Sequence, residues 1–314
     1  MIDFRYHLVS VISIFLALAV GIVLGAGPLQ GNLGTQLTDQ VAALRVEKQA
    51  LNDQLAASER QVAAGEEFAS AVSERVLDGA LSGHEVVVIV LPSADGGLVD
   101  LLEEGVASSG ATVNATVTLS GDWFDPTLAP KRAEAASAAA STLGMSSPLS
   151  GDALLAEALA RLTVSTDVVS ASESRTAALK TLTDAGFVDA SAEQLKPADL
   201  AIVVSGPFAG DEAEVQRQAE TIRTLARFVA ESSAGAVVAG PEPVAGTGKS
   251  LTSDAVASVR GVEATARLIS TVDHASDPSG PAIVVLALRS ELAGDVGHYG
   301  TADGATAAAP RVSP

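Results

Sequence analysis

Cysteine is absent from this 314-residue chain, and its absence excludes several kinds of site. Disulfide scaffolds, thiolate zinc sites, iron–sulfur clusters and cysteine nucleophiles all need a sulfur that the chain lacks. Basic residues are also scarce, with 19 Lys and Arg against 38 Asp and Glu and a net charge of −19. Because phosphate neutralisation needs clustered Lys and Arg, this balance argues against a nucleic-acid partner. Aromatic residues make up only 3%, so any core is built from Ala, Val and Leu.

Residues 8–27, LVSVISIFLALAVGIVLGAG, form a long apolar run without a charge. A helix of about 20 residues rising 1.5 Å each matches the roughly 30 Å hydrocarbon core of a bilayer. We therefore predict a transmembrane helix at 8–27, with the lipid bilayer as its partner. Arg5 precedes the run and the first charge after it is Asp39. The positive-inside rule then leaves residues 1–7 as a cytoplasmic stub and places the rest of the chain outside the cytoplasm.

Two features of this run leave alternatives open. Gly21 and Gly25 form a GxxxG pattern, which lets two helices approach closely and marks them as candidate oligomerisation residues. Glycine is, however, also common in membrane helices that do not associate. A small-x-small pattern at Gly25-Ala26-Gly27 is compatible with signal-peptide cleavage, although the apolar run is longer than the 7–15 residues typical of signal peptides.

A second helical segment follows a predicted break at Pro28–Gly34. We call residues 35–82 the stalk, and its apolar positions recur at alternating spacings of four and three, the 3.5-residue repeat of a coiled coil. Two interpretations remain: parallel self-association into a homo-oligomer, or one long helix packed on the chain's own globular domain. The positions of this heptad seam are Leu37, Val41, Leu44, Lys48, Leu51, Leu55, Ser58 and Val62.

Residues 84–300 have the pattern of an α/β domain. Short apolar runs bounded by Gly or Pro are typical of strands covered on both faces, and they alternate with helical patterns. This alternation predicts a three-layer domain with a mostly parallel sheet. The predicted strands are 85–91, 111–119, 200–204, 236–239 and 282–288. The predicted helices are 97–108, 151–162, 172–185 and 212–231, with a surface helix and loop over 131–149 and a flexible tail over 301–314.

Nucleotide-binding motifs are incomplete. The sequence PVAGTGKS at Pro243–Ser250 has proline where a phosphate loop has its first glycine. The segment Pro92–Gly97 after the first strand lacks a GxGxxG pattern, and the turns after two later strands contain proline, which donates no amide to an anion. We therefore expect no nucleotide or dinucleotide site.

Metal ligands are sparse, and no catalytic constellation is visible. The histidines are His7, His84, His274 and His298, and none of the spacings HxH, HxxxH or HExxH occurs. A site made of Asp273, His274 and His298 would form only if the fold brought them together. Soft Cu(I) prefers thiolate and thioether ligands, yet the chain has no Cys and only two Met. We expect no cofactor and no enzymatic activity.

The segment FRYHLVSVISIFLALAVGIVLG at 4–25 and the heptad seam resemble the start of the mycobacterial copper transport protein B family of actinobacterial envelope proteins. Further similar segments are 113–119, 182–188, 270–273, 283–288 and 294–301, the last with Gly-His-Tyr-Gly. The resemblance alone implies a role in keeping intracellular copper low, copper as the candidate metal, and a location in the cell envelope, which the family description extends to the outer envelope. It assigns no binding residue.

The sequence thus favours a single-pass, membrane-anchored envelope protein with an implied role in copper export or copper homeostasis, acting as an oligomer or with partners. The alternative from a different class is an adaptor that tethers envelope machinery through the stalk. An extracytoplasmic α/β enzyme is the third hypothesis, and it requires a deep polar pocket at the strand ends.

Overall fold

The computed structural model divides the chain into two compact units, Met1–Gly65 and Glu66–Pro314. The structure describes residues 4–26, 29–164, 172–190, 195–241 and 254–311.

The first unit contains the apolar helix predicted from the sequence. Helix α1 runs from Phe4 to Ala26, and its large apolar side chains are exposed along its whole length. Ser13 does not interrupt it, because its hydroxyl donates to the Val9 carbonyl at 2.8 Å within the same helix. Among the described residues, α1 is the one helix long and apolar enough to cross a membrane.

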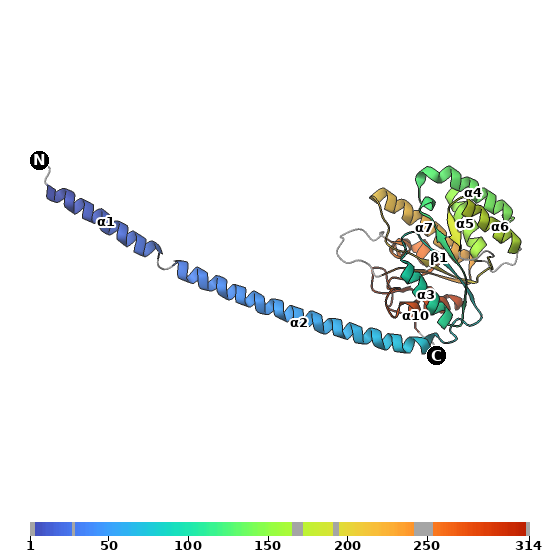
Figure 1. The fold of residues 1–314 in the computed structure, drawn as a ribbon, viewed down its shortest axis with the longest axis horizontal. Coiled ribbons are helices and arrows are strands. Elements are labelled where there is room, and N and C mark those ends of the chain that lie inside the picture. The colour runs from blue at the N-terminus through green and yellow to red at the C-terminus, as the bar shows by residue number, and fades with distance from the viewer. Residues whose placement is uncertain (1–3, 27–28, 165–171, 191–194, 242–253, 312–314) are drawn as a thin grey trace. The chain divides into compact units, whose positions relative to one another are not determined.

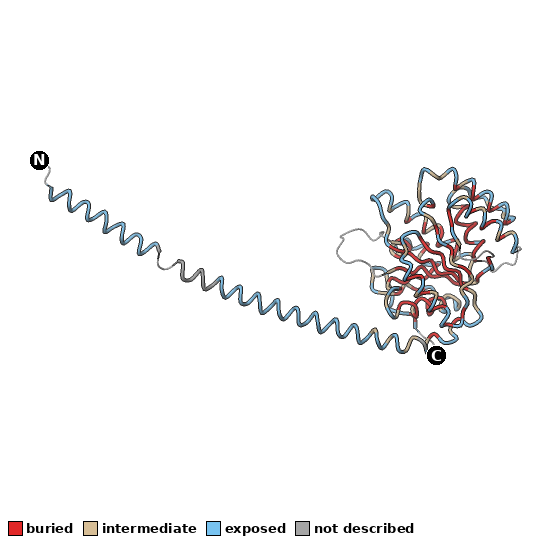
Figure 2. The backbone as a smooth tube through the Cα atoms, in the orientation of Figure 1, coloured by how far each residue is buried: buried red, intermediate tan, exposed pale blue. Residues whose placement is uncertain are grey.

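Helix α2 runs from Leu29 to Leu77, so it begins inside the predicted break and ends before the predicted end of the stalk at 82. Gly65 does not end the helix, whereas Gly79 and Gly83 follow it with φ of 73° and 83°. These left-handed conformations favour glycine and turn the chain toward the first strand. Figure 2 shows α2 exposed along nearly all its length in the described part.

The second unit is built on a seven-stranded sheet of order β3-β2-β1-β4-β5-β6-β7. Its neighbours pair in parallel, apart from the antiparallel pair β2–β3. The mostly parallel sheet predicted from the sequence is therefore confirmed. The strands are β1 Glu85–Val90, β2 Thr112–Leu119, β3 Val188–Ala190, β4 Leu200–Val204, β5 Gly235–Ala239, β6 Ser270–Val272 and β7 His298–Tyr299.

Helices cover both faces of the sheet, which explains why its central strands are apolar throughout (Figure 1). Helices α3 and α10 share one apolar cluster with Val86, Val88 and Val90 of β1. Helices α4, α5, α6, α7 and α8 share the other with Val87 and Ile89 of the same strand. The elements of these layers are α3 Gly96–Ser108, η1 Gly121–Trp123, η2 Pro126–Leu128, α4 Ala129–Thr142, α5 Gly151–Thr163, α6 Ser172–Asp184, α7 Glu212–Ser232, α8 Ala255–Arg260, α9 Glu263–Ala266 and α10 Gly280–Leu292.

The strand predicted at 282–288 is wrong, because these residues form the middle of α10. Pro281 sits in the first turn of that helix, where its missing N–H costs nothing. The run is almost entirely apolar because the helix packs on β5 and β6 and also against its neighbour α3, where a Cβ on Gly105 would meet the Pro281 Cβ at 2.6 Å. The sheet is instead extended by β6 and β7, which are too short to give a periodic signal.

The first part of the Ala-rich segment 131–149 belongs to helix α4, which ends at Thr142, but that helix is not confined to the surface. Small side chains let it pack closely against α5 and α6, so one face joins the core. The buried residues of this face are Arg132, Ala135, Ala136, Ala139 and Ala140.

Candidate functional site

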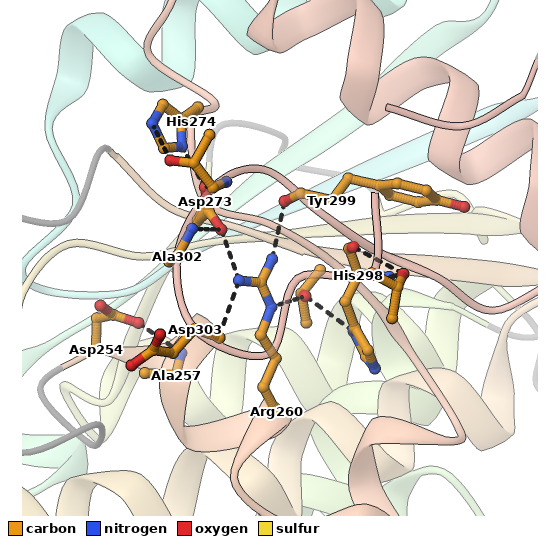
Figure 3. A network of polar contacts seen from close by, with 12 residues as sticks. Asp254, Ala257, Arg260, Asp273, His274, His298, Tyr299, Ala302 and Asp303 are labelled. Carbon is orange, nitrogen blue, oxygen red and sulfur yellow. Dashed lines mark hydrogen bonds and ion pairs between the residues drawn. The ribbon is translucent and has the colours of Figure 1, made fainter. Parts of the chain in front are cut away.

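Polar side chains gather where β6 and β7 end, at the carboxyl edge of the sheet (Figure 3). Asp273 directly follows β6, and Arg260 is the last residue of α8. One guanidinium nitrogen of Arg260 lies 2.6 Å from Asp273 Oδ2, and both side chains are only 3% exposed. Such a buried pair is stable only when the remaining donors and acceptors are also satisfied.

Asp273 meets that condition with backbone and imidazole donors. The Thr301 amide donates to Oδ1 at 3.0 Å, the Ala302 amide donates to Oδ2 at 3.1 Å, and His274 Nδ1 contacts Oδ1. Burial alone would raise the pKa of Asp273, but the hydrogen bonds from Arg260, His274 and Thr301 bring it below its ordinary value. Asp273 is therefore a fully engaged carboxylate.

Arg260 also uses its other nitrogens. Its Nε donates to Thr271 Oγ1 at 2.7 Å, and a terminal nitrogen donates to the Tyr299 carbonyl at 2.8 Å. The same side chain lies 3.5 Å from the Asp303 carbonyl. Arg260 thereby ties β6, β7 and the segment after β7 to α8.

This network includes residues of the segment 301–314, for which the sequence predicts a flexible tail. Residues 301–303 bind Asp273 and Arg260, Tyr299 pairs with Ala307, and Pro310 is buried. The described part of the tail, up to residue 311, therefore belongs to the domain.

The three candidate metal ligands, Asp273, His274 and His298, do not converge on one point where a metal ion could bind. His274 has both ring nitrogens engaged, Nδ1 with Asp273 and Nε2 with Thr301 Oγ1 at 3.0 Å. His298 Nδ1 lies 3.0 Å from Thr271 Oγ1, and Figure 3 shows this ring on the other side of the Arg260 guanidinium from His274. Burial and the Arg260 charge lower the pKa of His298. Within the described ranges, no three His, Asp or Glu side chains are grouped to hold a metal ion.

The order carboxylate, imidazole, hydroxyl in Asp273, His274 and Thr301 also occurs in nucleophilic hydrolases. In those enzymes the carboxylate stabilises the imidazolium that forms during catalysis. Here Arg260 already neutralises the carboxylate from within 2.6 Å. We interpret the arrangement as one that holds the segment after β7 against β6.

The usual ligand crevice of this topology lies between β1 and β4, where the strand order reverses. A Cβ on Gly206, after β4, would lie 1.8 Å from the Ser93 carbonyl oxygen, after β1. The backbone of the loop after β1 therefore lies directly against the backbone of the loop after β4. The N-terminus of α3 opens beside them, but Asp95 Oδ1 already accepts from the Gly97 amide at 2.9 Å. A carboxylate thus occupies the place where a phosphate would bind.

A depression of about 400 Å³ lies elsewhere, between η1, α5 and α7. Its charged lining includes Arg132 and Asp152, which bind each other at 2.7 Å. The phosphate-loop-like segment Pro243–Ser250 lies in a part of the chain outside the described residues.

Comparison with known proteins gives one consistent result. Residues 1–310 match the family described as "Copper transport outer membrane protein, MctB". The chain belongs to this family. Proteins named "Copper transporter MctB" from Mycobacterium tuberculosis and Mycobacterium bovis are 30% identical over 97% of this chain and 98% of their own length. The protein of that name from Mycobacterium leprae is 29% identical over 98% of each.

The MctB family resemblance found in the sequence is thereby confirmed, and the family names point to a copper transport protein rather than an enzyme. The part of the chain with the most exposed apolar side chains is the first unit. Gly21 and Gly25 lie on α1, where a Cβ on either would meet nothing within 4 Å. The seam residues Leu37, Val41, Leu44, Leu51, Leu55 and Val62 lie on α2 with exposed fractions of 46–62%, and Lys48 is also exposed.

Sequence reasoning missed Arg260 and Thr301, the two partners that organise the network around Asp273. Neither is adjacent to Asp273 in sequence, and although Thr301 ends the similar segment 294–301, nothing in that segment marks it as a partner of Asp273. Only the return of the chain past β7 brings Thr301 to β6. The one available signal was Gly300, whose φ of 128° aims the next amides at Asp273.

Proposed function

We propose that this chain is a membrane-anchored protein of the cell envelope that acts in copper export or copper homeostasis, as an oligomer or with partners. The observation that carries the proposal is a family match over residues 1–310 on a chain with a single apolar helix of spanning length in its described part. One helix cannot enclose a pore, so transport requires further copies or other proteins.

The proposed layout is a cytoplasmic stub at 1–7, a membrane span at 8–27, a helical stalk at 35–82 and an extracytoplasmic α/β domain at 84–300. Arg5 before the span supports this orientation by the positive-inside rule. Protease added to intact spheroplasts should digest the α/β domain, and separation of inner from outer membranes should show which membrane holds the chain. Protection of the domain until lysis would contradict the orientation.

Copper is the proposed cargo, and the donor chemistry limits how the chain handles it. Cu(I) prefers sulfur ligands. The chain has no cysteine, and its methionines are Met1 and Met145. The histidines of the described site are engaged with Asp273, Thr301 and Thr271. We therefore propose that partners or neighbouring copies supply the route that copper takes.

The test is total cell copper in a deletion strain grown with added copper, measured against the parent strain and with zinc as the control metal. We expect copper to rise in the deletion strain, zinc to stay unchanged, and the wild-type gene to restore the parental level. Parental copper in the deletion strain would overturn the proposal.

The same lack of sulfur donors favours a second candidate, an adaptor that tethers envelope machinery without any role in copper. Cross-linking in cells separates the two. Discrete protein partners together with unchanged cell copper in the deletion strain would support the adaptor.

A further inference from the structure

We propose that two copies of this chain join through their α2 helices as a parallel, in-register coiled coil between Leu37 and Val62. The proposal names the partner left open above, and it rests on the proposed function only for the membrane anchor that makes the two helices parallel. Two anchors in one membrane also raise the local concentration of the helices.

The first argument is the spacing of the exposed apolar residues. Leu37, Val41, Leu44, Leu51, Leu55 and Val62 are all between 46% and 62% exposed, and together with Lys48 and Ser58 they recur at alternating intervals of four and three residues. A regular helix has 3.6 residues per turn, so a strict 3.5-residue repeat keeps one face in line only when two helices wind around each other.

The second argument is which apolar residue stands at which heptad position. Positions d hold Leu37, Leu44, Leu51 and Ser58, and positions a hold Val41, Lys48, Leu55 and Val62, so the β-branched residues of the seam stand only at position a. In parallel coiled coils, β-branched residues at a with leucine at d favour two strands over three or four. The residue types therefore point to a second copy and to a dimer.

The third argument is the charge of Lys48, the one charged residue on the seam. Its neighbours three and four residues away in its own helix are Leu44, Arg45, Leu51 and Asn52, and none is acidic. In a parallel dimer, position a of one helix lies beside position g of the other. Glu47 occupies position g, so Glu47 of the second copy would face Lys48.

A lipid surface is a poor occupant for this face. The seam carries Lys48 and is flanked by Arg45, Glu47 and Glu59, and among the described helices only α1 meets the criteria for a membrane span. On the outer face of α2, Gln49 donates to Asp53 Oδ1 at 2.9 Å within the helix.

Disulfide cross-linking tests the proposal. Because the chain has no cysteine, every disulfide between two copies must form at an introduced residue. Leu44→Cys and Leu51→Cys each place a thiol at position d, and Ala50→Cys places one at position c on the outside. The full-length variants are oxidised with diamide in isolated membranes, without copper, and the covalent dimer is followed on non-reducing gels.

We expect both position-d variants to form the dimer at least about tenfold faster than Ala50→Cys, because a disulfide requires Cα atoms within roughly 4.4–6.8 Å. In an antiparallel pair, two positions one heptad apart could not both meet their own copies. Rapid cross-linking at only one of them would therefore overturn the parallel register. Equal rates at all three positions, or cross-links only to a different protein, would overturn the dimer.

Lys48→Leu provides an independent measurement, since a polar residue at position a costs stability. In the Leu51→Cys background we expect it to raise the rate of cross-linking, and an unchanged or lower rate would contradict the assignment of Lys48 to the seam. Cell copper separates this proposal from the proposed function. Fast cross-linking of a variant in a strain whose copper does not depend on the protein would leave the dimer standing and remove the copper role.

Discussion

The two units of this protein differ in how far their large apolar side chains are exposed to solvent. In Met1–Gly65, the large apolar side chains that the structure describes are exposed, from Phe4 at 79% to Val41 at 46%. In the described part of Glu66–Pro314, only Phe68, Val262, Leu268 and Val296 are exposed large apolar residues. The second unit therefore owes its stability to its own core, whereas the first must gain its stability from what surrounds it.

This comparison can be tested in the intact chain because its single tryptophan, Trp123, is in the second unit and is 2% exposed. Its fluorescence during denaturation in detergent reports the unfolding of the α/β domain and not of the two N-terminal helices. Each prediction below uses this signal.

The largest effect is expected from Arg260→Ala. The substitution leaves the Asp273 carboxylate buried without its cation and removes the link to Thr271. We expect a loss of about 3–5 kcal/mol in the free energy of unfolding of the domain. The matched control is Lys180→Ala, which breaks an ion pair to Asp184 that is 73% and 63% exposed and should cost less than about 0.5 kcal/mol. Equal losses from both variants would show that burial does not decide the strength of these pairs.

The two units can be compared directly by truncating one leucine in each, Leu155→Ala and Leu51→Ala, and measuring the free energy of unfolding of the α/β domain. Leu155 on α5 is fully buried, and its truncation should cost about 3 kcal/mol through the lost contacts and the cavity left behind. Leu51 on α2 is 58% exposed, and its truncation should change domain unfolding by less than about 0.5 kcal/mol. A large effect of Leu51→Ala on Trp123 fluorescence would show that α2 packs on the domain, which was the alternative interpretation of the heptad seam.

The smallest effect concerns Glu291, which lies on α10 and accepts from the Ser270 amide at 2.6 Å. Burial raises the pKa of Glu291 to about 7, above its ordinary value of 4.5, although the bonds from Ser270 oppose the shift. Between these values the folded state holds a proton that the unfolded state has released, so stability falls as pH rises.

Replacement by glutamine removes this titration and keeps an oxygen that accepts from Ser270. Glu291→Gln should therefore be up to about 2 kcal/mol more stable relative to wild type at pH 8 than at pH 5. Unfolding by urea at the two pH values measures the difference, with the exposed Glu231→Gln as control. An identical pH dependence in wild type and Glu291→Gln would refute this role for Glu291.

The sequence predicted the elements with strong periodic signals and missed those defined by tertiary contacts. The apolar run at 8–27 and the valine-rich strand at 85–91 are long enough for their pattern to decide the structure. The run at 282–288 was misread because a helix buried on all sides and a buried strand look alike over seven residues. Strands β6 and β7 have three and two residues, so only their pairing defines them.

The candidate site was predictable in part. Asp273 and His274 were chosen from the sequence, and the structure brings them into contact with each other. His298 was chosen with them but is bonded to Thr271 instead. Arg260 could not be found, because an arginine at the end of a six-residue helix carries no local mark of the carboxylate it will meet.

The contact between Gly206 and the Ser93 carbonyl has a practical consequence for anyone seeking an inhibitor. A compound that imitates a nucleotide would find backbone where doubly wound proteins ordinarily admit such a molecule. Helix α2 offers an alternative target. A designed peptide that presents leucines at the spacing of Leu37, Leu44 and Leu51 could compete for the exposed apolar face of α2.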